Sequence, residues 1–525
     1  TCLASLIRSR AAMYYMMQME VVYLGLALVS LCIVLLSGRR RRLSAGNEPP
    51  GPWQLPVLGS LHHLAGQLPH RAMRNLARRH GPVMLLWLGE VPTLVVSSRE
   101  GAREVMKTHD VAFATRPLNA TMRVLTNGGR GIAFAPYGDY WREIKKIVVS
   151  KLLSARRVLS FRAIREEEVA AMLRDVAQAA AARRPVELSR RISALVTDIT
   201  VRSVMGDRFK ERDEFLRSLD RGAKFASGFN PPDLWPSSRL VGWLSGTLRR
   251  AKDFCHVGNG ILDNIIREKM EGGGGGENED LLHVLLSIQK ENEGSLQFPL
   301  DMDAVKSVIF DVFAGGSETA STTLGWAIAE LIRNPMVMQK VTAEVRRTFE
   351  AHGTVAEHAL GELPYMHLVI RETLRLHTPL PLLIPRECRE SCQVLGYDVP
   401  RGTQVLINAW ALGRDERYWP DEPEMFRPER FLGKAGTDDF MGTDFSFLPF
   451  GAGRRMCPGI AFGLGNIELA LASLLFHFDW EGPPQDELDM AEVLGITVRR
   501  KADLLLRPIL WVPVLGVLSE GNKDH

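Results

Sequence analysis

The sequence predicts a mainly α-helical protein with a small β region, organised as one large domain behind an N-terminal transmembrane helix. Three observations support this fold class. An uncharged apolar run occupies 21–37, long amphipathic stretches dominate the remaining chain, and β-type patterns are confined to two short regions. No internal repeat and no shift in composition divides 53–525, so we predict one large domain over that range.

The composition is that of an ordinary folded protein. Apolar residues make up 46% and charged residues 24% of the 525 residues, which excludes wholesale disorder and fibrous architectures. The formal net charge of +4 is too small for a general nucleic-acid-binding surface, so no nucleic acid partner is expected. The six cysteines include no Cys-x-x-Cys pair, so neither a zinc site nor a disulfide scaffold is expected.

The first predicted element is a membrane anchor over 19–38. The uncharged part, 21–37, would be about 25 Å long as a helix, which can just span a thinned bilayer core. The four arginines at 39–42 follow directly and would keep the C-terminal side in the cytosol. A cleavable signal peptide is the alternative, but its basic residues would precede the apolar run. Since Met19 opens a more natural start than Thr1, 1–18 is interpreted as a possible leader or artefact.

The segment 39–52 is predicted to be a basic stop-transfer sequence followed by a proline-rich hinge. Its prolines, in Glu48-Pro49-Pro50-Gly51-Pro52, prevent the anchor helix from continuing and form a short stiff spacer. A flexible linker is the alternative, and it would favour Gly and Ser instead.

The domain over 53–525 contains both helical and β-type patterns. Two strands are expected within 83–96 and a second β region at 393–409. The longest helix should run from about 303 to 334, where Pro335 stops it, and it would measure roughly 48 Å. The five glycines at 272–276 indicate a flexible surface loop. Further amphipathic helices are expected at 138–160, 162–183, 190–205 and 247–271.

The segment 450–459, FGAGRRMCPG, carries the strongest chemical signal. Its glycines permit a tight loop, and Pro458 suits the first position of the apolar helix that follows. Cys457 then lies at a helix N-terminus, which favours a thiolate and hence metal ligation. A lone cysteine is more often a small buried hydrophobe, but the spacing F-x-x-G-x-R-x-C-x-G favours the ligand.

This segment resembles the haem-binding loop of the cytochrome P450 superfamily, and other motifs of that family follow the same order along the chain. The anchor and hinge are similar to those of plant A-type microsomal members. The resemblance implies the cytochrome P450 fold over essentially the whole chain. The supporting motifs are Trp141-Arg142-Glu143-Ile144-Lys145-Lys146, Ala314-Gly315-Gly316-Ser317-Glu318-Thr319, Glu372-Thr373-Leu374-Arg375 and Pro428-Glu429-Arg430-Phe431.

The resemblance implies that haem b is the cofactor and that Cys457 is the metal ligand, as the axial thiolate. Phe450 and Gly451 belong to the cofactor-binding loop. The haem propionates need cationic partners, and for Arg142 and Lys146 a solvated helix face is the more probable environment. The residues expected to bind the propionates are Trp141, Lys145, Arg386, Arg455 and, as a weaker candidate, Arg116.

Glu372 and Arg375 are spaced i,i+3, so they share a helix face and can pair. The alternative is a surface pair worth a few tenths of a kcal/mol. The resemblance favours a buried structural network in which Arg430 joins them and fixes the loop that carries Cys457.

Three residues of the long central helix are expected to be catalytic. Gly315 lies four residues before Thr319 on the same face, where a glycine leaves space for dioxygen and water. The resemblance implies that Thr319 contacts dioxygen and that Glu318 supplies protons. The alternative is a packing notch beside an ordinary helical glutamate.

The resemblance implies a monooxygenase that inserts one oxygen atom of O2 into a lipophilic substrate. Electrons would come from NADPH-cytochrome P450 reductase, so NADPH and flavins act only through that partner. The protein would be a single-pass protein of the endoplasmic reticulum membrane, in contact with lipid, with its catalytic domain on the cytosolic face. The expected reductase-docking residues are Lys145, Lys146, Lys151 and Arg454.

The expected pocket walls are largely apolar, which favours a neutral substrate, and the motifs resemble those of sesquiterpene and diterpene oxidases. Alkaloid, phenolic or amino-acid-derived substrates stay open as alternatives. A haem-thiolate isomerase or dehydratase, or a non-enzymatic haem sensor, are further alternatives that would not require Thr319 and Glu318. The residues expected to line the substrate pocket are Phe310, Phe313, Leu382, Leu383, Leu494 and Ile496.

Overall fold

The computed structural model describes residues 23–25 and 46–515, except for 208, 210, 213, 216, 218–221, 223, 224, 226, 227, 272–279, 292–297, 299, 434–438, 485 and 486. The predicted leader, the basic segment that follows the anchor and the five-glycine loop lie outside the described residues. Of the predicted anchor only 23–25 is described, and it is helical.

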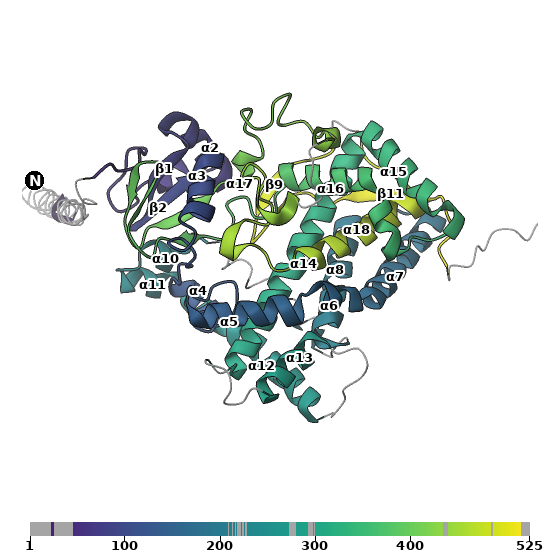
Figure 1. Ribbon diagram of the computed structural model, residues 1–525, viewed down its shortest axis with the longest axis horizontal. Helices are drawn as coiled ribbons and strands as arrows, with labels where there is room; N and C mark the ends of the chain where they lie inside the picture. The colour runs from purple at the N-terminus through teal and green to yellow at the C-terminus, as the bar shows by residue number, and fades with distance from the viewer. Residues whose placement is uncertain are drawn as a thin grey trace, which may run out of the picture.

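The helix α14, Met302–Arg333, passes through the middle of the molecule (Figure 1). Its first turn is capped by Asp301, whose carboxylate accepts a hydrogen bond of 2.9 Å from the amide of Ala304. It ends at Asn334, directly before Pro335, because proline cannot continue the hydrogen-bond ladder. The prediction of one long central helix over 303–334 is therefore confirmed.

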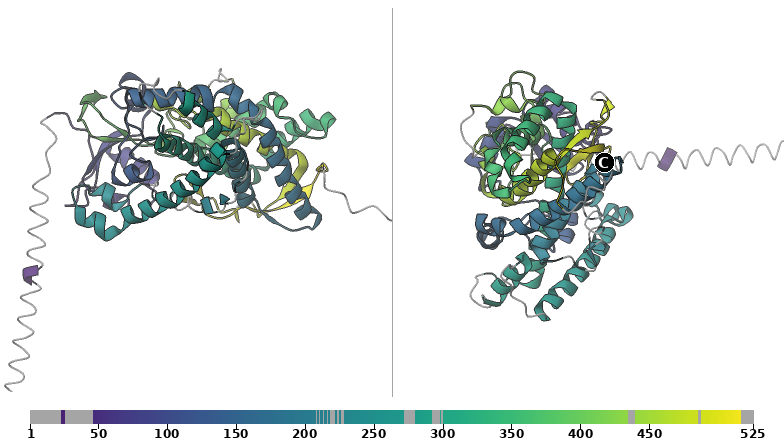
Figure 2. Two further views of the ribbon diagram at one scale, coloured as in Figure 1. Left: turned by 90° about the horizontal axis from the view of Figure 1, so that it is seen from below. Right: turned by 90° about the vertical axis from the view of Figure 1, so that its right-hand side faces the viewer.

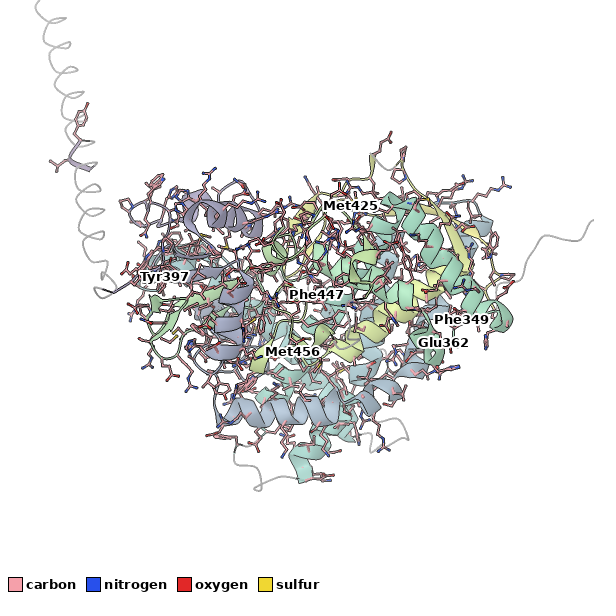
Figure 3. All side chains as sticks on the ribbon, turned by 45° about the horizontal axis from the view of Figure 1, so that its top comes forward. Phe349, Glu362, Tyr397, Met425, Phe447 and Met456 are labelled. Carbon is pink, nitrogen blue, oxygen red and sulfur yellow. The ribbon has the colours of Figure 1, made fainter. Side chains whose placement is uncertain are left out.

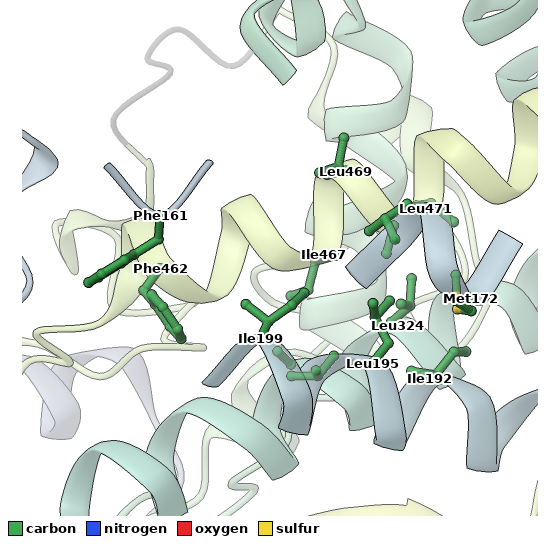
Figure 4. Close-up of a cluster of buried hydrophobic side chains, with 14 of the residues drawn as sticks. Phe161, Met172, Ile192, Leu195, Ile199, Leu324, Phe462, Ile467, Leu469 and Leu471 are labelled. Carbon is green, nitrogen blue, oxygen red and sulfur yellow. The ribbon is translucent and has the colours of Figure 1, made fainter. Parts of the chain in front are cut away.

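Three helices surround α14 and form most of the core: α8 (Leu188–Met205), α16 (Pro364–Leu376) and α18 (Ile460–His477). Figure 4 shows Ile199 and Leu195 of α8 facing Ile467 of α18 and Leu324 of α14. At one end of this layer Phe161 packs edge-to-face on Phe462, with 6.5 Å between the ring centroids. The buried apolar side chains fix the position of α18, which begins directly after the loop that carries Cys457.

Helix α18 is long and apolar enough to cross a membrane, and within the described part of the chain it is the one helix with that property. Two-thirds of its apolar window, 67%, is buried inside the protein. Because most of its apolar surface is covered by the rest of the protein, α18 is a core helix of the domain.

The four-stranded sheet that contains β1 and β2 lies at the end of the molecule opposite to α7 and α15, whereas β11 lies beside those two helices (Figure 1). Strands β1 (Val83–Leu88) and β2 (Val91–Val96) form an antiparallel hairpin in the register Val83 to Val96. Strand β7 (Gln404–Ile407) pairs with β2 in parallel, and β4 (Arg386–Glu387) completes the order β1-β2-β7-β4. Both predicted β regions are thus confirmed. The remaining strands are β3 (Val186–Glu187), β5 (Cys392–Val394), β6 (Tyr397–Val399), β8 (Phe478–Glu481), β9 (Glu492–Leu494), β10 (Val498–Arg500) and β11 (Leu505–Leu510).

The predicted single helix at 138–160 is divided in the structure. Helix α5 (Asp139–Ile147) passes into one wide π-helical turn, Val148–Leu152, and α6 (Ala155–Ser160) begins anew. The division occurs at Ser154, whose hydroxyl accepts a hydrogen bond of 3.4 Å from the Arg157 amide and caps α6.

Most of the other described helices lie toward the outside of the domain, whereas the short α17 is completely buried. Both views of Figure 2 and the lower edge of Figure 1 show α12 (Thr247–Glu271) as an outer helix. The remaining α-helices are α2 (Pro69–His80), α3 (Arg99–Arg103), α4 (Ala120–Leu125), α7 (Arg162–Ala181), α10 (Pro231–Leu234), α11 (Arg239–Ser245), α13 (Leu281–Glu291), α15 (Pro335–Phe349) and α17 (Ala409–Leu412).

Candidate active site

An internal cavity of about 240 Å³ lies between α14, α5 and the loop that carries Cys457. Figure 3 places Met456, the residue before Cys457, near the middle of the molecule. Most of the wall is apolar, and the polar groups are concentrated at one side. The predicted site residues that line the cavity are Arg116, Trp141, Lys145, Gly315, Thr319, Leu383, Arg386, Phe450, Gly451, Arg455 and Cys457.

The loop before α18 owes its shape to two glycines. Gly451 and Gly453 have φ of 69° and 68°, a region that other residues rarely adopt. A Cβ atom on Gly453 would lie 2.3 Å from the carbonyl oxygen of Met106, so no larger residue fits there. The amide of Cys457 donates a hydrogen bond of 3.0 Å to the carbonyl of Phe450, which closes the loop and directs residue 457 toward the cavity.

The Cys457 sulfur accepts a hydrogen bond of 3.4 Å from the amide of Gly459. Burial raises the pKa of the Cys457 thiol, and the Gly459 hydrogen bond lowers it by less. The amide hydrogen bond thus acts in the expected direction, toward a thiolate, but it is smaller than the effect of burial. A thiolate at this place needs a cation on the cavity side, which a bound metal would provide.

Three arginine side chains converge on the polar side of the cavity. Arg116, Arg386 and Arg455 are only 7%, 2% and 8% exposed. Arg386 donates a hydrogen bond of 2.8 Å to the carbonyl of Ala452 in the cysteine loop. Arg116 donates one of 2.9 Å to the carbonyl of Pro385, and its Nε atom is buried without a hydrogen-bond partner.

The positive charges of this arginine cluster are incompletely balanced. Burial, together with the Arg386 charge, lowers the pKa of Arg455 to about 9, and burial lowers that of Arg386 to about 10. Burial and the two neighbouring arginines also lower the pKa of Arg116. Within the described residues, the carboxylate that hydrogen-bonds Arg386 is that of Asp110, at 3.4 Å. Such a cluster is suited to a ligand that brings two carboxylates of its own.

Trp141 and Lys145 of α5 complete the polar side. Trp141 Nε1 donates a hydrogen bond of 3.0 Å to the carbonyl of Ile132, and the Arg455 guanidinium lies 4.2 Å from its ring centroid. Lys145 Nζ donates one of 2.6 Å to the carbonyl of Arg454. Arg142, by contrast, pairs with Asp139 on the exposed face of the helix. Lys145 lines the cavity and is half-buried, which favours a cofactor contact, while its part in reductase docking stays a prediction.

These groups fit an iron porphyrin with two propionates. A thiol from Cys457 meets one face of an apolar space, and the buried arginines with an unpartnered Nε atom lie at its edge. A sulfur ligand at one face and a cationic edge are the residue types that a haem with two propionates needs.

Helix α14 forms the wall opposite Cys457. A Cβ atom on Gly315 would meet nothing within 4 Å, so the helix is open to the cavity at this turn. The Thr319 hydroxyl donates a hydrogen bond of 2.6 Å to the Gly315 carbonyl, one turn before it. Gly315 and Thr319 therefore form one polar notch in an apolar wall.

Glu318 does not line the cavity. Its Oε1 atom accepts a hydrogen bond of 2.8 Å from the Thr497 hydroxyl, which lies 3.0 Å from the Thr322 hydroxyl. Thr497 is completely buried between α14 and the β9–β10 hairpin. Glu318 directly precedes Thr319 in the sequence, but its carboxylate points to the hairpin and not into the cavity.

Asp311 is a cavity residue that the sequence argument missed. Its carboxylate accepts hydrogen bonds from the amides of Ile132 and Ala133, the latter at 3.0 Å. Burial raises its pKa to about 6. Because Asp311, Gly315 and Thr319 are spaced four residues apart on one helix face, that spacing could have revealed it.

The predicted substrate-pocket residues are largely displaced from this cavity. Of the six, Leu383 lines it. Phe310 and Phe313 pack on Phe215 instead, with ring centroids at 5.8 and 5.0 Å. Each helical residue turns by about 100°, so positions 310 and 313 lie outside the face that contains 311, 315 and 319. Leu382 packs beside the β1–β2 hairpin, and Leu494 and Ile496 lie in the β9–β10 hairpin.

A second charged group lies behind the cysteine loop, away from the cavity. Glu372 and Arg375 are fully buried, and Glu372 accepts hydrogen bonds of 2.7 Å from Arg375 and 2.8 Å from Arg430. Arg375 also donates to the carbonyl oxygens of Pro423 and Met425, at 2.7 and 3.1 Å. The network therefore ties α16 to the long segment that precedes the loop.

A family model described as "Cytochrome P450" matches residues 49–506. Dolabradiene monooxygenase from Zea mays is 48% identical over 500 residues, which cover 93% of this chain and 98% of that protein. Zealexin A1 synthase from Zea mays is 48% identical over 472 residues, which cover 88% and 92%. A solved zebra fish cytochrome P450 with abiraterone has a TM-score of 0.72 at 27% identity, covering 85% of this chain and 99% of that one.

Proposed function

This chain belongs to the cytochrome P450 family as a monooxygenase, and we propose that it inserts one oxygen atom of O2 into a sesquiterpene or diterpene. The coarser assignment, oxidation of terpenoids, accords with the similarity to dolabradiene monooxygenase and zealexin A1 synthase. One observation supports the haem-thiolate site most strongly. The Cys457 sulfur and a buried, incompletely balanced arginine cluster line the same apolar cavity.

The chain's own residues hold the cofactor. When bound, haem b supplies the iron that activates dioxygen, and thiolate ligation favours cleavage of the O–O bond. Cys457 would be the iron ligand, with the Gly459 amide donating to its sulfur. The propionates would pair with Arg116, Arg386 and Arg455, whose positive charges would then be balanced. Trp141 and Lys145 would complete the polar edge of the cofactor site. Phe450 and Gly451 form part of the cavity wall in the loop that carries Cys457.

The notch of Gly315 and Thr319 would hold dioxygen and a water in the cavity. The Thr319 hydroxyl can rotate from the Gly315 carbonyl to donate into the cavity, since the space beside Gly315 is open. Glu318 would carry protons to this notch from the solvent side. For that step its carboxylate must leave the Thr497 hydroxyl, so the β9–β10 hairpin would govern when Glu318 is free.

The cavity wall favours a neutral substrate over an amine. A protonated alkaloid would need a free carboxylate, and Asp311 is the acidic residue that lines the cavity in the described structure. Its carboxylate already accepts hydrogen bonds from the backbone amides of Ile132 and Ala133, so it is a poor partner for a substrate ammonium group. An apolar terpenoid needs no such partner.

NADPH-cytochrome P450 reductase is the electron donor in this proposal. Lys146, Lys151 and Arg454 are exposed, and Arg454 lies in the cysteine loop itself. An acidic reductase surface would be steered to them. The proposed location is the endoplasmic reticulum membrane, with the predicted segment 19–38 as the anchor and the domain in the cytosol.

The test supplies a panel of terpene olefins to microsomes that contain this protein, the reductase and NADPH. Mass spectrometry should detect a product heavier by one oxygen atom, and labelled O2 should supply that atom. Cys457→Ser should abolish product and the red-shifted Soret band of the ferrous carbon monoxide complex. Turnover without NADPH would instead support an isomerase or dehydratase, and haem binding without turnover of terpenes, alkaloids, phenolics or amino-acid derivatives would support a sensor.

A further inference from the structure

Two thiols meet outside the cavity, in the turn between β4 and β5. The sulfur atoms of Cys388 and Cys392 are 4.0 Å apart. Cys388 is completely buried, whereas Cys392 is half-buried and so has partial access to solvent. Neither residue contributes to the cavity or to the arginine cluster, so the proposed function leaves this pair unexplained.

The local backbone holds the two sulfur atoms together. Cys388 Sγ donates a hydrogen bond of 2.9 Å to the carbonyl of Glu390 and lies 3.6 Å from the carbonyl of Val399. Val399 is the cross-strand partner of Cys392 in the β5–β6 hairpin. Val399 therefore contacts the Cys388 sulfur and pairs with the backbone of Cys392, which keeps the two cysteines close together. A disulfide bond of about 2.05 Å would require the sulfur atoms to approach by about 2 Å.

We propose that Cys388 and Cys392 form a reversible oxidative modification site, at which hydrogen peroxide converts the two thiols into a disulfide. The Cys392 thiolate attacks one peroxide oxygen, the O–O bond breaks, and hydroxide leaves and is protonated to water. The Cys388 sulfur then attacks the resulting sulfenic acid of Cys392. The S–S bond forms, the S–O bond breaks, and the oxygen leaves as a second water with the Cys388 proton. Two thiols thus lose two electrons and one peroxide is reduced to two waters.

The environments of the two thiols assign their order of reaction. The contact between the two sulfur atoms lowers the pKa of Cys392, and the same contact together with burial raises the pKa of Cys388. Cys392 is also the more accessible of the two, so it is the attacking group and Cys388 resolves. Cys255 provides a contrast within the same chain, because burial raises its pKa to about 11 and its thiol contacts the Val124 carbonyl.

The pair lies directly behind the proposed propionate-binding strand. Cys388 follows β4, which contains Arg386, and its amide donates 2.9 Å to the carbonyl of Thr403. The amide of the next residue, Arg389, donates 2.9 Å to the carbonyl of Ala112, in the segment that leads to Arg116. A disulfide at this turn would therefore lie close to the backbone that carries Arg386 and Arg116. The oxidation itself does not require haem to be present.

The experiment treats the full-length, haem-loaded protein with hydrogen peroxide, alkylates the free thiols after denaturation and digests it with trypsin without reduction. Trypsin cleaves after Arg386, Arg389 and Arg401, so the two cysteines fall in separate peptides, 387–389 and 390–401. The expected result is a linked pair of these peptides that disappears on reduction. In Cys388→Ser, a sulfenic-acid trap should label Cys392 about tenfold or more above Cys255, because the resolving thiol is missing.

The Soret band, recorded for every sample, shows that the variants are folded and loaded. The proposal is overturned if folded wild-type protein yields no linked peptides while both peptides are alkylated as fully as that of Cys255. It is also overturned if the linkage forms only after denaturation, or if Cys392→Ser leaves Cys388 as readily trapped as Cys392 is in Cys388→Ser.

Discussion

The buried carboxylate of Glu372 provides the sharpest test of how this fold is held together. It accepts four hydrogen bonds: two from the Arg375 guanidinium at 2.7 Å, one from Arg430 at 2.8 Å and one from the Arg427 amide at 2.8 Å. The side chains of Glu372, Arg375 and Arg430 are 0%, 0% and 4% exposed. Removal of the single negative charge would therefore leave two guanidinium groups without a counter-ion.

We expect Glu372→Gln to destabilise the domain by about 3–5 kcal/mol. The substitution conserves shape, so little of this loss arises from packing, and the magnitude is that of a broken buried ion pair. In a chain of this length the unfolding entropy, about 2 cal/mol/K per residue, makes each kcal/mol worth roughly 1 °C in Tm. A fall of about 3–5 °C in the midpoint for loss of the Soret band is expected, with much faster inactivation at fixed temperature.

A matched control is available on the surface. Arg162 and Glu166 form an ion pair of the same length, 2.7 Å, but both side chains are 38% exposed. Because solvent screens that pair, Glu166→Gln should change stability by no more than about 0.5 kcal/mol. If Glu372→Gln and Glu166→Gln have the same thermal midpoint, burial is not the reason that the Glu372 network stabilises the domain.

Three further predictions concern the cavity. Asp311 has a pKa of about 6 when folded against an ordinary value of 3.8, so its contribution to stability is greatest below pH 4 and is lost as the pH rises through 6. Asp311→Asn removes this titrating group. As the pH rises from 4 to 6, the free energy of unfolding of the variant should therefore increase relative to that of the wild type by up to about 3 kcal/mol. Denaturation at several pH values measures this difference, and parallel curves would contradict it. Because the hairpin is proposed to govern when Glu318 is free, Thr497→Val should leave Glu318 free at all times, so that protons arrive out of step with the electrons and product formed per NADPH falls about threefold or more at unchanged KM. Thr497→Ser keeps the hydroxyl and should retain the wild-type yield; equal coupling in all three proteins would exclude the role. Arg455→Gln should lower the molar ratio of haem to purified protein at least about twofold, as measured from the absorbance of extracted haem, and full occupancy would argue against the propionate contact.

The structure explains why some predictions from sequence succeeded. The central helix, the β1–β2 hairpin and the glycine loop depend on apolar periodicity, on proline and on positive φ, which are properties of neighbouring residues. The i,i+3 spacing of Glu372 and Arg375 is local in the same sense. Where a cap interrupts a periodic pattern, as Ser154 does at the start of α6, the local argument already fails.

Local sequence patterns could not predict which side chains point into the cavity. Phe310 and Phe313 were expected in the pocket and pack on Phe215 instead, because which face of α14 meets the cavity depends on how neighbouring helices pack. Asp311 and its amide partner at Ala133 are separated by 178 residues, and Thr497 and Glu318 by 179. No periodicity relates residues so distant in the chain.

The amino-acid sequence by itself determined the helical class, the cysteine loop and the types of residue that could hold an iron porphyrin. Only the tertiary structure decided the environment of those residues: that the arginine cluster is desolvated with few counter-charges, that Cys457 is buried enough to raise its pKa, and that Glu318 faces a hairpin rather than the cavity. The physical reason is that burial and charge pairing arise from contacts between distant segments, whereas backbone conformation is largely specified by adjacent residues.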